Sequence, residues 1–420
     1  MDGNLIIENA LVVTPLGKKA LKGDEMKKIC EISQATIIVE KGIITFVGKK
    51  EDAPKVEEPE IFDKFDLKGN VVMPGFVDSH THLIFGGFRP DEFEWRLKGD
   101  SYMSIMERGG GIQSTVNATK AESYFNVLSK ARWFLHKMSE MGVTTVEAKS
   151  GYGLDEKTET RMLEIIADLN QERDKFIEII PTFLGAHAVP PEYKGRTSEY
   201  VDSIIEYLPR IKELAKFCDV FCEKNVFEIE ESRRLLQAAK SLGYKLKLHA
   251  DEIVTLGGGE LSAELHAVSA DHLLHVSDEG IKRMAEAGVV ATLLPLTAFA
   301  LKEPYAPARK FIEAGCAVAL ATDLNPGSCF SGSIPLTIAL ACIYMNMTIE
   351  ETITALTLNG AAALDLAESV GSIEVGKFGD MIILGSDNYR VLPYYVGMNC
   401  VQTTIFHGNI VNGAPDSQQA

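Results

Sequence analysis

The sequence predicts an α/β protein: a (β/α)8 TIM-like barrel with a second, smaller β-sandwich domain built from both termini. Two patterns lead to this fold class. In the middle of the 420-residue chain, apolar runs alternate with amphipathic helical stretches, which is typical of parallel α/β architecture. Both ends of the chain instead carry short, strand-like segments separated by turns. We therefore expect one large barrel inserted between the two halves of a β domain.

The two ends share β-branched, alternating sequences. The first 68 residues contain NLIIENALVV and ATIIVEKGIITFVGKK, and the chain from about 371 contains GSIEVGKFGDMIILGS and QTTIFHGNIVNG. Alternating and β-branched residues with Lys-Gly between the runs are typical of antiparallel hairpins. We expect residues 1–68 and 371–420 to form the composite β-sandwich and residues 69–370 to form the barrel.

The middle contains as many apolar runs as a (β/α)8 barrel needs strands. They lie at 71–82, 142–149, 176–185, 218–223, 244–250, 267–273, 288–294 and 316–323. The interval of about 250 to 300 residues is the usual size of such a barrel, whereas doubly wound sheets usually have fewer strands.

Local signals predict helices between these runs. TKAE at 119–122 reads as a capping box for a helix that Gly142 ends. Ser277 is a predicted N-cap, with Gly288 as the matching stop, and TIEE at 348–351 is another capping box.

Composition excludes several functional classes. The 59 acidic residues outnumber the 42 basic ones, and the net charge of -17 repels nucleic acid and anionic membrane surfaces. The longest apolar run, 288–301, contains Pro295 and is too short to span a bilayer. We therefore expect no nucleic acid and no membrane as partners. An anionic small-molecule substrate would need a local cation to overcome this charge.

Cysteine usage and the N-terminus indicate a cytoplasmic protein. The seven cysteines are odd in number and widely spaced, unlike a disulfide framework, and fit a reducing compartment. The start MDGNLIIENALVV lacks the basic beginning and long apolar core of a signal peptide.

The stretch VVMPGFVDSHTHL, residues 71–83, carries the clearest chemical signal. His80 and His82 alternate, so in a strand both imidazoles share one face and can bind one metal ion. Catalytic groups of barrels gather where strands end, and His249, His272 and Asp323 end the fifth, sixth and eighth runs. Three imidazoles and a carboxylate can hold a divalent metal and leave one position open for water.

Further groups complete a hydrolytic site. Glu252 follows His249 by three residues, where it can act as general base, and His272 can orient or deprotonate water or polarise a carbonyl. The pattern predicts metal-assisted hydrolysis at an sp² carbon, with Glu252 or Asp323 taking the proton of water. Lys245 and Lys247 share the parity of His249, and we expect them to precede the buried part of that strand. Asp323 by itself could also be a helix cap.

The sequence resembles the amidohydrolase superfamily and, within it, the imidazolonepropionase family. The resemblance covers essentially the whole chain and rests on six segments in order: GGFRPDEFEWRLKGDSYMSIMERGGGIQST, EAKSGYGL, PTFLGAHAVPPEY, LHADEI, ADHLLHVS and ATDLNPGS. The HxH pair is specific only to the superfamily, whereas the Arg89 segment, SGYG and GAHAVPPEY point to the family. The resemblance implies hydrolytic opening of the ring of 4-imidazolone-5-propanoate to N-formimino-L-glutamate in histidine degradation.

The same resemblance implies roles for individual residues. A single zinc or iron ion would be held by His80, His82, His249 and Asp323, with Glu252, His272 and Asp323 as the catalytic acid and base groups. Substrate would be bound by Arg89, Tyr102, Tyr152, His187, Glu252, Asn325, Gly327 and Ser328. Arg89 would supply the local cation for the propionate. Gly109 to Gly111 lack the context of a phosphate-binding loop and predict a mobile loop.

Several alternatives remain open from sequence. A related amidohydrolase that deaminates a nucleobase would share the metal ligands but would not need Arg89 or Tyr152. A non-catalytic relative would be expected to have lost ligands, and none is missing. A second metal could be bridged by Lys149, Glu223 or Lys224, although one ion suffices for the predicted roles. The resemblance also implies a homodimer.

Overall fold

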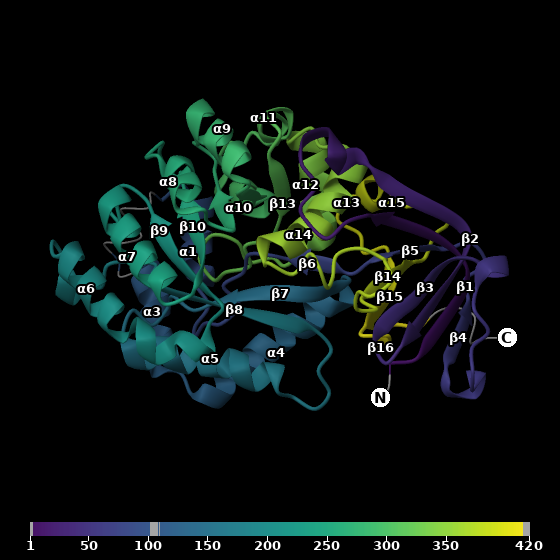
Figure 1. The fold of residues 1–420 in the computed structure, drawn as a ribbon. Helices are drawn as coiled ribbons and strands as arrows, with labels where there is room; N and C mark the ends of the chain where they lie inside the picture. Colours follow the sequence, from purple (N-terminus) through teal and green to yellow (C-terminus); the bar gives the residue numbers. More distant parts are fainter. Residues whose placement is uncertain (1–2, 101–107, 109, 415–420) are drawn as a thin grey trace.

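The computed structural model describes residues 3–100, 108 and 110–414 of the chain. Figure 1 shows a helix-covered barrel on the left and a sheet made from the first and last strands on the right. This arrangement confirms the predicted fold class: the purple and yellow ends of the chain meet in the same sheet, although hundreds of residues separate them.

The terminal sheet joins strands from both ends by continuous hydrogen bonding, in the order β16-β15-β14-β5-β1-β2-β3, with β4 paired to β1. Most neighbours are antiparallel, and β1 runs parallel to β4 and β5. Side chains from both halves of this sheet share one apolar core, which includes Ile7, Ile37 and Ile383. Its strands are β1(Leu5–Pro15), β2(Ile29–Glu40), β3(Ile43–Lys49), β4(Asp63–Asp66), β5(Val71–Pro74), β14(Met381–Leu384), β15(Val401–Phe406) and β16(Asn409–Asn412).

The run 71–82, predicted as one barrel strand, is in fact divided between the two sheets. Its first part, β5, pairs with β1 and β14 in the terminal sheet, and its second part, β6(Phe76–Asp78), pairs with β7 in the barrel. Gly75 makes this passage possible, because a Cβ there would lie 2.2 Å from Thr144 Oγ1. His80 and His82 follow β6 and lie outside the regular strand.

The described residues form a barrel of eight parallel strands in sequence order, and each of the eight predicted runs overlaps one of these strands. They are β6, β7(Val143–Lys149), β8(Glu178–Ala186), β9(Phe217–Cys222), β10(Lys245–Ala250), β11(Ser269–His272), β12(Val290–Leu293) and β13(Ala317–Leu320). Backbone contacts just beyond the first and last strands close the ring. Thr81 bridges Leu324, and the Asp323 N–H donates to His80 O at 3.0 Å. Closure therefore brings Asp323 directly beside the HxH pair.

Helices cover the outside of the barrel (Figure 1). The outer layer includes α4(Tyr124–Glu140), α5(Glu156–Asn170), α6(Thr197–Tyr207), α7(Ile229–Ser241), α8(Gly258–Leu265), α9(Asp278–Ala287), α11(Ala308–Glu313), α13(Ile349–Leu356) and α14(Leu358–Ala363). Other helices are α1(Pro90–Leu97), α3(Ile112–Ala121), α10(Pro295–Leu301), α12(Ile334–Tyr344) and α15(Val391–Tyr394). Short 3₁₀ turns are η1(Gly23–Lys27), η2(Lys50–Asp52), η3(Pro59–Ile61), η4(Pro191–Tyr193) and η5(Leu208–Leu214).

Two of the three predicted helix caps are confirmed. The Ser277 hydroxyl accepts from Gly280 N at the start of α9, and Thr348 and Glu351 form a reciprocal capping box on α13. The TKAE prediction is wrong. Thr119 lies inside α3, and Ser123 caps α4 instead, accepting a hydrogen bond from Asn126 N. The segment contains the end of α3 and the start of α4, so the N-cap of α4 lies four residues after the predicted one.

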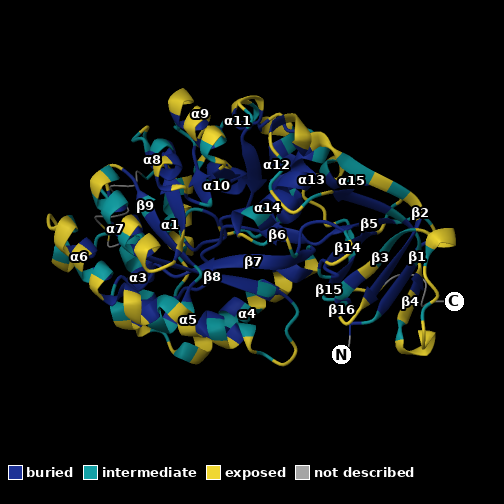
Figure 2. Cartoon of the chain, viewed as in Figure 1, coloured by how far each residue is buried: buried dark blue, intermediate teal, exposed yellow. Residues whose placement is uncertain are grey.

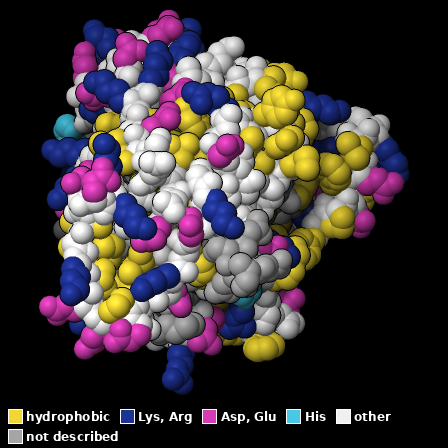
Figure 3. Space-filling model, turned by 90° about the vertical axis from the view of Figure 1, so that its right-hand side faces the viewer, with side chains coloured by type: hydrophobic (Ala, Val, Ile, Leu, Met, Phe, Trp, Pro, Cys, Tyr) yellow, Lys and Arg dark blue, Asp and Glu magenta, His cyan; other side chains and the backbone are white. Residues whose placement is uncertain are grey.

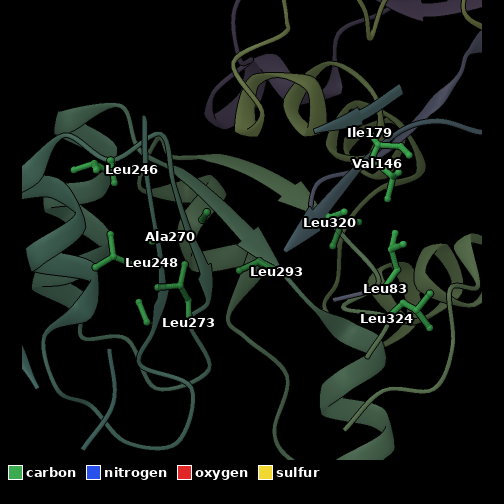
Figure 4. Close-up of a cluster of buried hydrophobic side chains, with 14 of the residues drawn as sticks. Leu83, Val146, Ile179, Leu246, Leu248, Ala270, Leu273, Leu293, Leu320 and Leu324 are labelled. Atoms are coloured by element: carbon green, nitrogen blue, oxygen red, sulfur yellow. The ribbon is translucent and has the colours of Figure 1, made fainter. Parts of the chain in front are cut away.

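Alternate side chains along each barrel strand face opposite environments. On β10, Leu246 and Leu248 belong to the apolar core between barrel and helices, and Figure 4 shows them with Leu293 and Leu320, which lie on β12 and β13. Figure 2 shows the barrel strands as almost wholly buried. Because Cβ atoms alternate along a strand, Lys247 and His249 must point the other way, into the barrel. The barrel interior is therefore polar.

The surface seen in Figure 3 carries interspersed acidic and basic side chains, with apolar ones gathered at its upper right. This face has no continuous basic patch of the kind that binds nucleic acid. Among the described residues, no helix combines the length and the apolar character needed to cross a membrane.

Candidate active site

Loops that follow the barrel strands line a cavity of about 720 Å³. This volume suits a small-molecule ligand. Most of the predicted site residues line it: His82, Arg89, Tyr152, His187, His249, Glu252, His272, Asp323, Asn325, Gly327 and Ser328. His80 lies just behind this wall and is fully buried. Tyr102 is outside the described residues.

The predicted metal ligands converge at the bottom of the cavity. His80 Nε2 and His82 Nε2 each lie 3.6 Å from Asp323 Oδ1, and His249 Nε2 lies 3.3 Å from His82 Nε2. Ligand atoms of His80, His82 and His249 lie within 4.8 Å of one another, as do those of His80, His272 and Asp323. The structure thus brings together side chains from four barrel strands or the loops that follow them.

Electrostatics and unpaired atoms both fit a bound cation. Burial lowers the pKa of His80 and of His82 well below the usual value, so both imidazoles are neutral at pH 7, the form that can bind a metal ion. Burial opposes the charged form of His249, but the nearby Asp219 carboxylate outweighs it and raises the pKa. His80 Nε2 and Asp323 Oδ1 are buried and have no hydrogen-bond partner among the described residues. Orphaned buried polar atoms are costly, and a metal ion would satisfy them.

Two of these residues adopt backbone conformations that non-glycine residues rarely use. His272 has φ 74° and Asp323 has φ 54°. Such strain typically persists where function over-determines the backbone. Asp323 is further fixed by the Thr297 hydroxyl, which donates to Oδ2 at 2.6 Å. The loop ends of β11 and β13 are therefore shaped to aim these two side chains.

Glu252 and His272 lie beside the ligand set. Glu252 Oε1 is 3.5 Å from His272 Nδ1, and 17% of the Glu252 side chain is exposed. Removal from water, together with the like charge of Asp323, raises the pKa of Glu252 to about 8. Burial raises the pKa of Asp323 to about 6, although Thr297 opposes the rise. A carboxylate whose pKa lies near neutrality is suited to take up and release a proton.

A second group of predicted residues lies on another wall of the cavity. The His187 ring stacks on that of His82, with centroids 4.9 Å apart and planes 16° apart. The Gly151 carbonyl accepts from His187 Nδ1 at 3.0 Å, which leaves Nε2 as an acceptor. Burial lowers the pKa of His187 to about 3 and raises that of the buried Tyr152 hydroxyl. Both rings therefore act as neutral polar groups.

Arg89 occupies the part of the cavity wall beside the turn that follows Asp323. Its side chain is only 10% exposed, and Nη1 lies 3.3 Å from Glu92 Oε2. Glu92 Oε2 also accepts from Gly111 N at 3.0 Å. Arg96 adds a second cation to the wall, and its Nη2 donates to Gly327 O at 2.9 Å. Two guanidinium groups in an acidic protein are the positive site that an anionic ligand requires.

The NPGS turn after Asp323 is organised by Asn325. Its side-chain oxygen accepts hydrogen bonds from Gly327 N and Ser328 N, and its amide donates to Asp323 O at 2.7 Å. The predicted residues of this turn thus form one rigid unit. The predicted mobile loop at 109–111 is only partly described, because residue 109 lies outside the described residues.

Sequence reasoning missed the charged residues beneath the site. Lys247, which we expected to precede the buried part of its strand, is wholly buried inside the barrel; only Lys245 is exposed, beside Asp365. Asp219 and Asp271 were not singled out. A signal was present, since VTTVEAK and CDVFC place charged residues within runs that are otherwise apolar.

The chain is similar to known proteins over almost its full length. The amidohydrolase family model matches residues 71–411. The chain is 64% identical over 411 residues to the imidazolonepropionase of Bacteroides thetaiotaomicron, covering 97% of this chain and 99% of that one. It is 62% identical over 415 residues to the imidazolonepropionase of Phocaeicola vulgatus, covering 98% and 100%. A solved 5-methylcytosine deaminase from Klebsiella pneumoniae has a similar fold, with TM-score 0.73, 17% identity and 98% of both chains covered.

Proposed function

The chain belongs to the amidohydrolase family and, within it, to the imidazolonepropionases, and from this premise we propose that it hydrolyses 4-imidazolone-5-propanoate to N-formimino-L-glutamate. One structural observation supports this proposal most directly. The same cavity of about 720 Å³ contains a convergent His and Asp cluster and a largely buried arginine. The cluster suits hydrolysis of a cyclic amide, and the arginine suits the carboxylate tail of this substrate.

We propose that His80, His82, His249 and Asp323 hold one zinc or iron ion. Imidazole and carboxylate ligands suit both metals. When bound, the ion supplies a Lewis acid that lowers the pKa of water towards about 7. Elemental analysis of the purified protein, followed by reconstitution of the metal-free protein with each metal under anaerobic conditions, identifies the metal that restores turnover.

The substrate is oriented by groups on the opposite wall. The Arg89 guanidinium binds the propionate, and Tyr152 and His187 hydrogen-bond the carboxylate or the ring as neutral groups. The rigid turn of Asn325, Gly327 and Ser328 adds backbone and side-chain polar atoms to the same wall. Fixing both ends of a small substrate holds its carbonyl carbon at one place in the cavity.

Glu252 is the proposed proton carrier. It takes the proton of the attacking water as the C–O bond forms at the cyclic amide carbon. It then returns a proton to the ring nitrogen as the C–N bond breaks. His272, 3.5 Å from Glu252, polarises the carbonyl oxygen or stabilises the charged carboxylate. The sum of these steps is addition of one water across one C–N bond.

The carboxylate clamp is tested with freshly prepared substrate and its carboxamide analogue. We expect Arg89→Ala to raise KM for the acid about 100-fold while leaving the poorer amide nearly unaffected, because only the acid has a charge to lose. The exposed Arg173→Ala is the matched control. Equal losses for both compounds would refute the clamp, and ammonia release from guanine or cytosine with good metal occupancy would overturn the substrate assignment.

The proton carrier is tested separately. Glu252→Gln keeps the shape but removes the base, so we expect kcat to fall about 10²- to 10⁴-fold with unchanged metal content. Glu303→Gln, which alters another carboxylate lining the same cavity, is the control. A Glu252→Gln variant with normal kcat would assign the proton to another group.

We propose that the protein is a homodimer of the cytoplasm. Helix α12 packs against α15, and together with the residues after α15 they expose a set of large apolar side chains: Ile343, Tyr344, Tyr394, Tyr395, Val396 and Met398. Exposed apolar patches of this kind mark association surfaces. All seven cysteines are described and none is in a disulfide, which supports a reducing compartment. Sedimentation velocity of Tyr394→Ser/Met398→Ser against the parent tests the dimer, and an unchanged mass would refute this surface.

A further inference from the structure

Five charged side chains fill the barrel interior directly beneath the proposed metal ligands. They come from four different strands, β7, β9, β10 and β11, and each is completely buried: Glu147, Lys149, Asp219, Lys247 and Asp271. Burying so many charges costs several kcal/mol per ion unless each is paired. Such a cluster needs a functional explanation, because apolar side chains would fill the barrel interior without this desolvation penalty.

Two of the carboxylates lie beside ligand histidines. Each is close to the ring nitrogen Nδ1, on the side of the imidazole that points away from the proposed metal site. Asp271 Oδ2 lies 2.6 Å from His80 Nδ1, and Asp219 Oδ2 lies 3.0 Å from His249 Nδ1. An ionised carboxylate can only accept, so His80 Nδ1, which is hydrogen-bonded to Asp271, carries the hydrogen, and the charge of Asp219 beside His249 Nδ1 favours the same tautomer there. The Nε2 lone pairs of His80 and His249 are then left for the metal. Each aspartate thus selects one tautomer and one ring orientation.

The two lysines hold these aspartates in place. Lys149 Nζ lies 2.8 Å from Asp219 Oδ2 and 3.7 Å from Asp271 Oδ2, so one ammonium group touches both aspartates. Lys247 Nζ lies 3.5 Å from Asp271 Oδ2 and donates to Ser79 O at 3.0 Å. Glu147 completes the cluster, with Oε2 2.8 Å from Lys149 Nζ and Oε1 3.4 Å from Lys247 Nζ.

The cluster also occupies a place where another cation could bind. Ligand atoms of His80, Glu147 and Asp271 lie within 4.8 Å of one another, close enough to share an ion. The ammonium groups of Lys149 and Lys247 already lie beside both carboxylates at this place. Lys149, considered above as a bridge to a second metal, is instead engaged as a cation by Glu147 and Asp219.

We propose that Asp271 and Asp219 are positioning residues of the metal site, orienting His80 and His249, and that Lys149 and Lys247 fix both aspartates as built-in counter-ions in place of a second metal. The inference rests on the metal-dependent function proposed above. It concerns metal binding alone, so it can be tested without substrate. Protein that binds zinc as expected but does not hydrolyse imidazolone propionate would leave this inference standing while overturning the proposed function.

The first test measures zinc affinity by competition with a chromophoric chelator. Asp271→Asn and Asp219→Asn each replace a charged acceptor by a neutral amide of the same shape. We expect each to weaken zinc binding about 10- to 100-fold, the usual effect of losing such an outer partner. The matched control is Asp380→Asn, which changes another buried aspartate, just before strand β14 of the terminal sheet. Its zinc affinity should equal that of the parent.

The second test uses cobalt as a spectroscopic probe at full occupancy. Reorienting a ligand imidazole changes the ligand field, so we expect altered Co²⁺ absorption bands in Asp271→Asn and Asp219→Asn but not in Asp380→Asn. A merely structural role would lower stability and leave the spectrum of the loaded protein unchanged. Parent-like zinc affinity and a parent-like cobalt spectrum in both variants would overturn the proposal.

A third variant covers the case in which Asp271→Asn does not fold. Losing one member of a buried charge network leaves its partner uncompensated. Asp271→Asn/Lys247→Met removes one charge of each sign and preserves the balance. We expect this double variant to show the same weakened zinc affinity, because Asp271 is the group that contacts His80. Lys247→Met alone, which keeps that contact, should weaken zinc binding less. Equal affinities for Lys247→Met and the double variant would refute the assignment to Asp271.

Discussion

The Arg89 guanidinium lies directly against the α-carbon of Gly327. A Cβ built at residue 327 would lie 2.0 Å from Arg89 Nη2, far inside any van der Waals contact. The φ angle of Gly327 is not in the left-handed region, so the glycine is required by this close approach and not by backbone conformation. The proposed carboxylate-binding residue and the turn after Asp323 are therefore fitted to each other.

Gly327→Ala is expected to displace Arg89 and raise KM for the acid substrate about 10- to 100-fold, because the added methyl group and the guanidinium cannot occupy the same space. Metal affinity should be unchanged, since the atoms nearest to an added Cβ belong to Arg89 and Asn325 and not to a proposed metal ligand. Steady-state kinetics and zinc titration measure the two quantities. Gly385→Ala is the control, because a Cβ there meets no atom within 4 Å. Parent-like KM in Gly327→Ala would contradict the fitted arrangement.

Glu159 holds the loop that carries Tyr152. The buried carboxylate on α5 accepts from Gly151 N at 2.9 Å, Gly153 N at 2.7 Å and Leu154 N at 2.8 Å. In Glu159→Gln one carboxylate oxygen is replaced by an NH₂ group, which cannot accept a hydrogen bond, so at least one of these backbone N–H groups loses its acceptor. Losing such a buried bond costs about 1–3 kcal/mol, so we expect kcat/KM to fall roughly 5- to 100-fold with full metal content. Glu156→Gln on the exposed side of α5 should retain parent kinetics, and identical behaviour of the two variants would disprove this role.

Metal removal is expected to destabilise the fold as well as abolish activity. A ligand that binds only the native state at 100 times its Kd stabilises it by about 2.7 kcal/mol. Chelation should therefore lower the Tm by several degrees, and adding zinc or iron should restore it. Differential scanning calorimetry measures the shift. In His249→Ala, which lacks one ligand, added metal should produce little change. An equal metal-induced shift in that variant would place the ion elsewhere.

The buried carboxyl group of Asp380, beside the terminal sheet, should make the free energy of unfolding depend on pH. Burial raises its pKa from 3.8 to about 7, even though Oδ1 accepts from His407 N. Between these values the folded protein holds a proton that the unfolded chain has released, so stability falls as pH rises from about 4 to 7 and then levels off. At roughly 1.4 kcal/mol per pH unit the loss is at most about 4 kcal/mol.

Asp380→Asn removes this titration. The parent should lose stability between pH 5 and pH 8, and the variant should not lose this contribution. We therefore expect the Tm of the variant minus the Tm of the parent to be larger at pH 8 than at pH 5, as measured by thermal unfolding at both pH values. Asp66→Asn supplies the control, because hydrogen bonds from Asn9 and Lys68 lower the pKa of Asp66, so its carboxylate is ionised in both states over this range and its Tm difference from the parent should stay constant. A constant difference between Asp380→Asn and parent across this range would show that Asp380 titrates normally in the folded state.

Much of the site was predictable because its residues obey a local rule. His249, His272 and Asp323 each end an apolar run, and the HxH pair follows another. Strand ends of a barrel meet on one face, so position along the chain is enough to place such residues together. The prediction failed where two elements compete for a short segment. Residues 71–74 suited either sheet, and only the pairing of β5 with β1 and β14 decided between them.

The sequence by itself determined the barrel, the composite terminal sheet and the ligand candidates, because periodicity and strand-end chemistry are written within short windows. Only the tertiary structure decided what lies beneath the site. From the sequence, a buried Lys247 had no visible partner in its strand. In the closed barrel it lies beside Glu147 and Asp271, which are distant in the sequence. A buried charge is tolerated only by partners at contact distance, and those partners exist only once the strands have assembled into a closed ring.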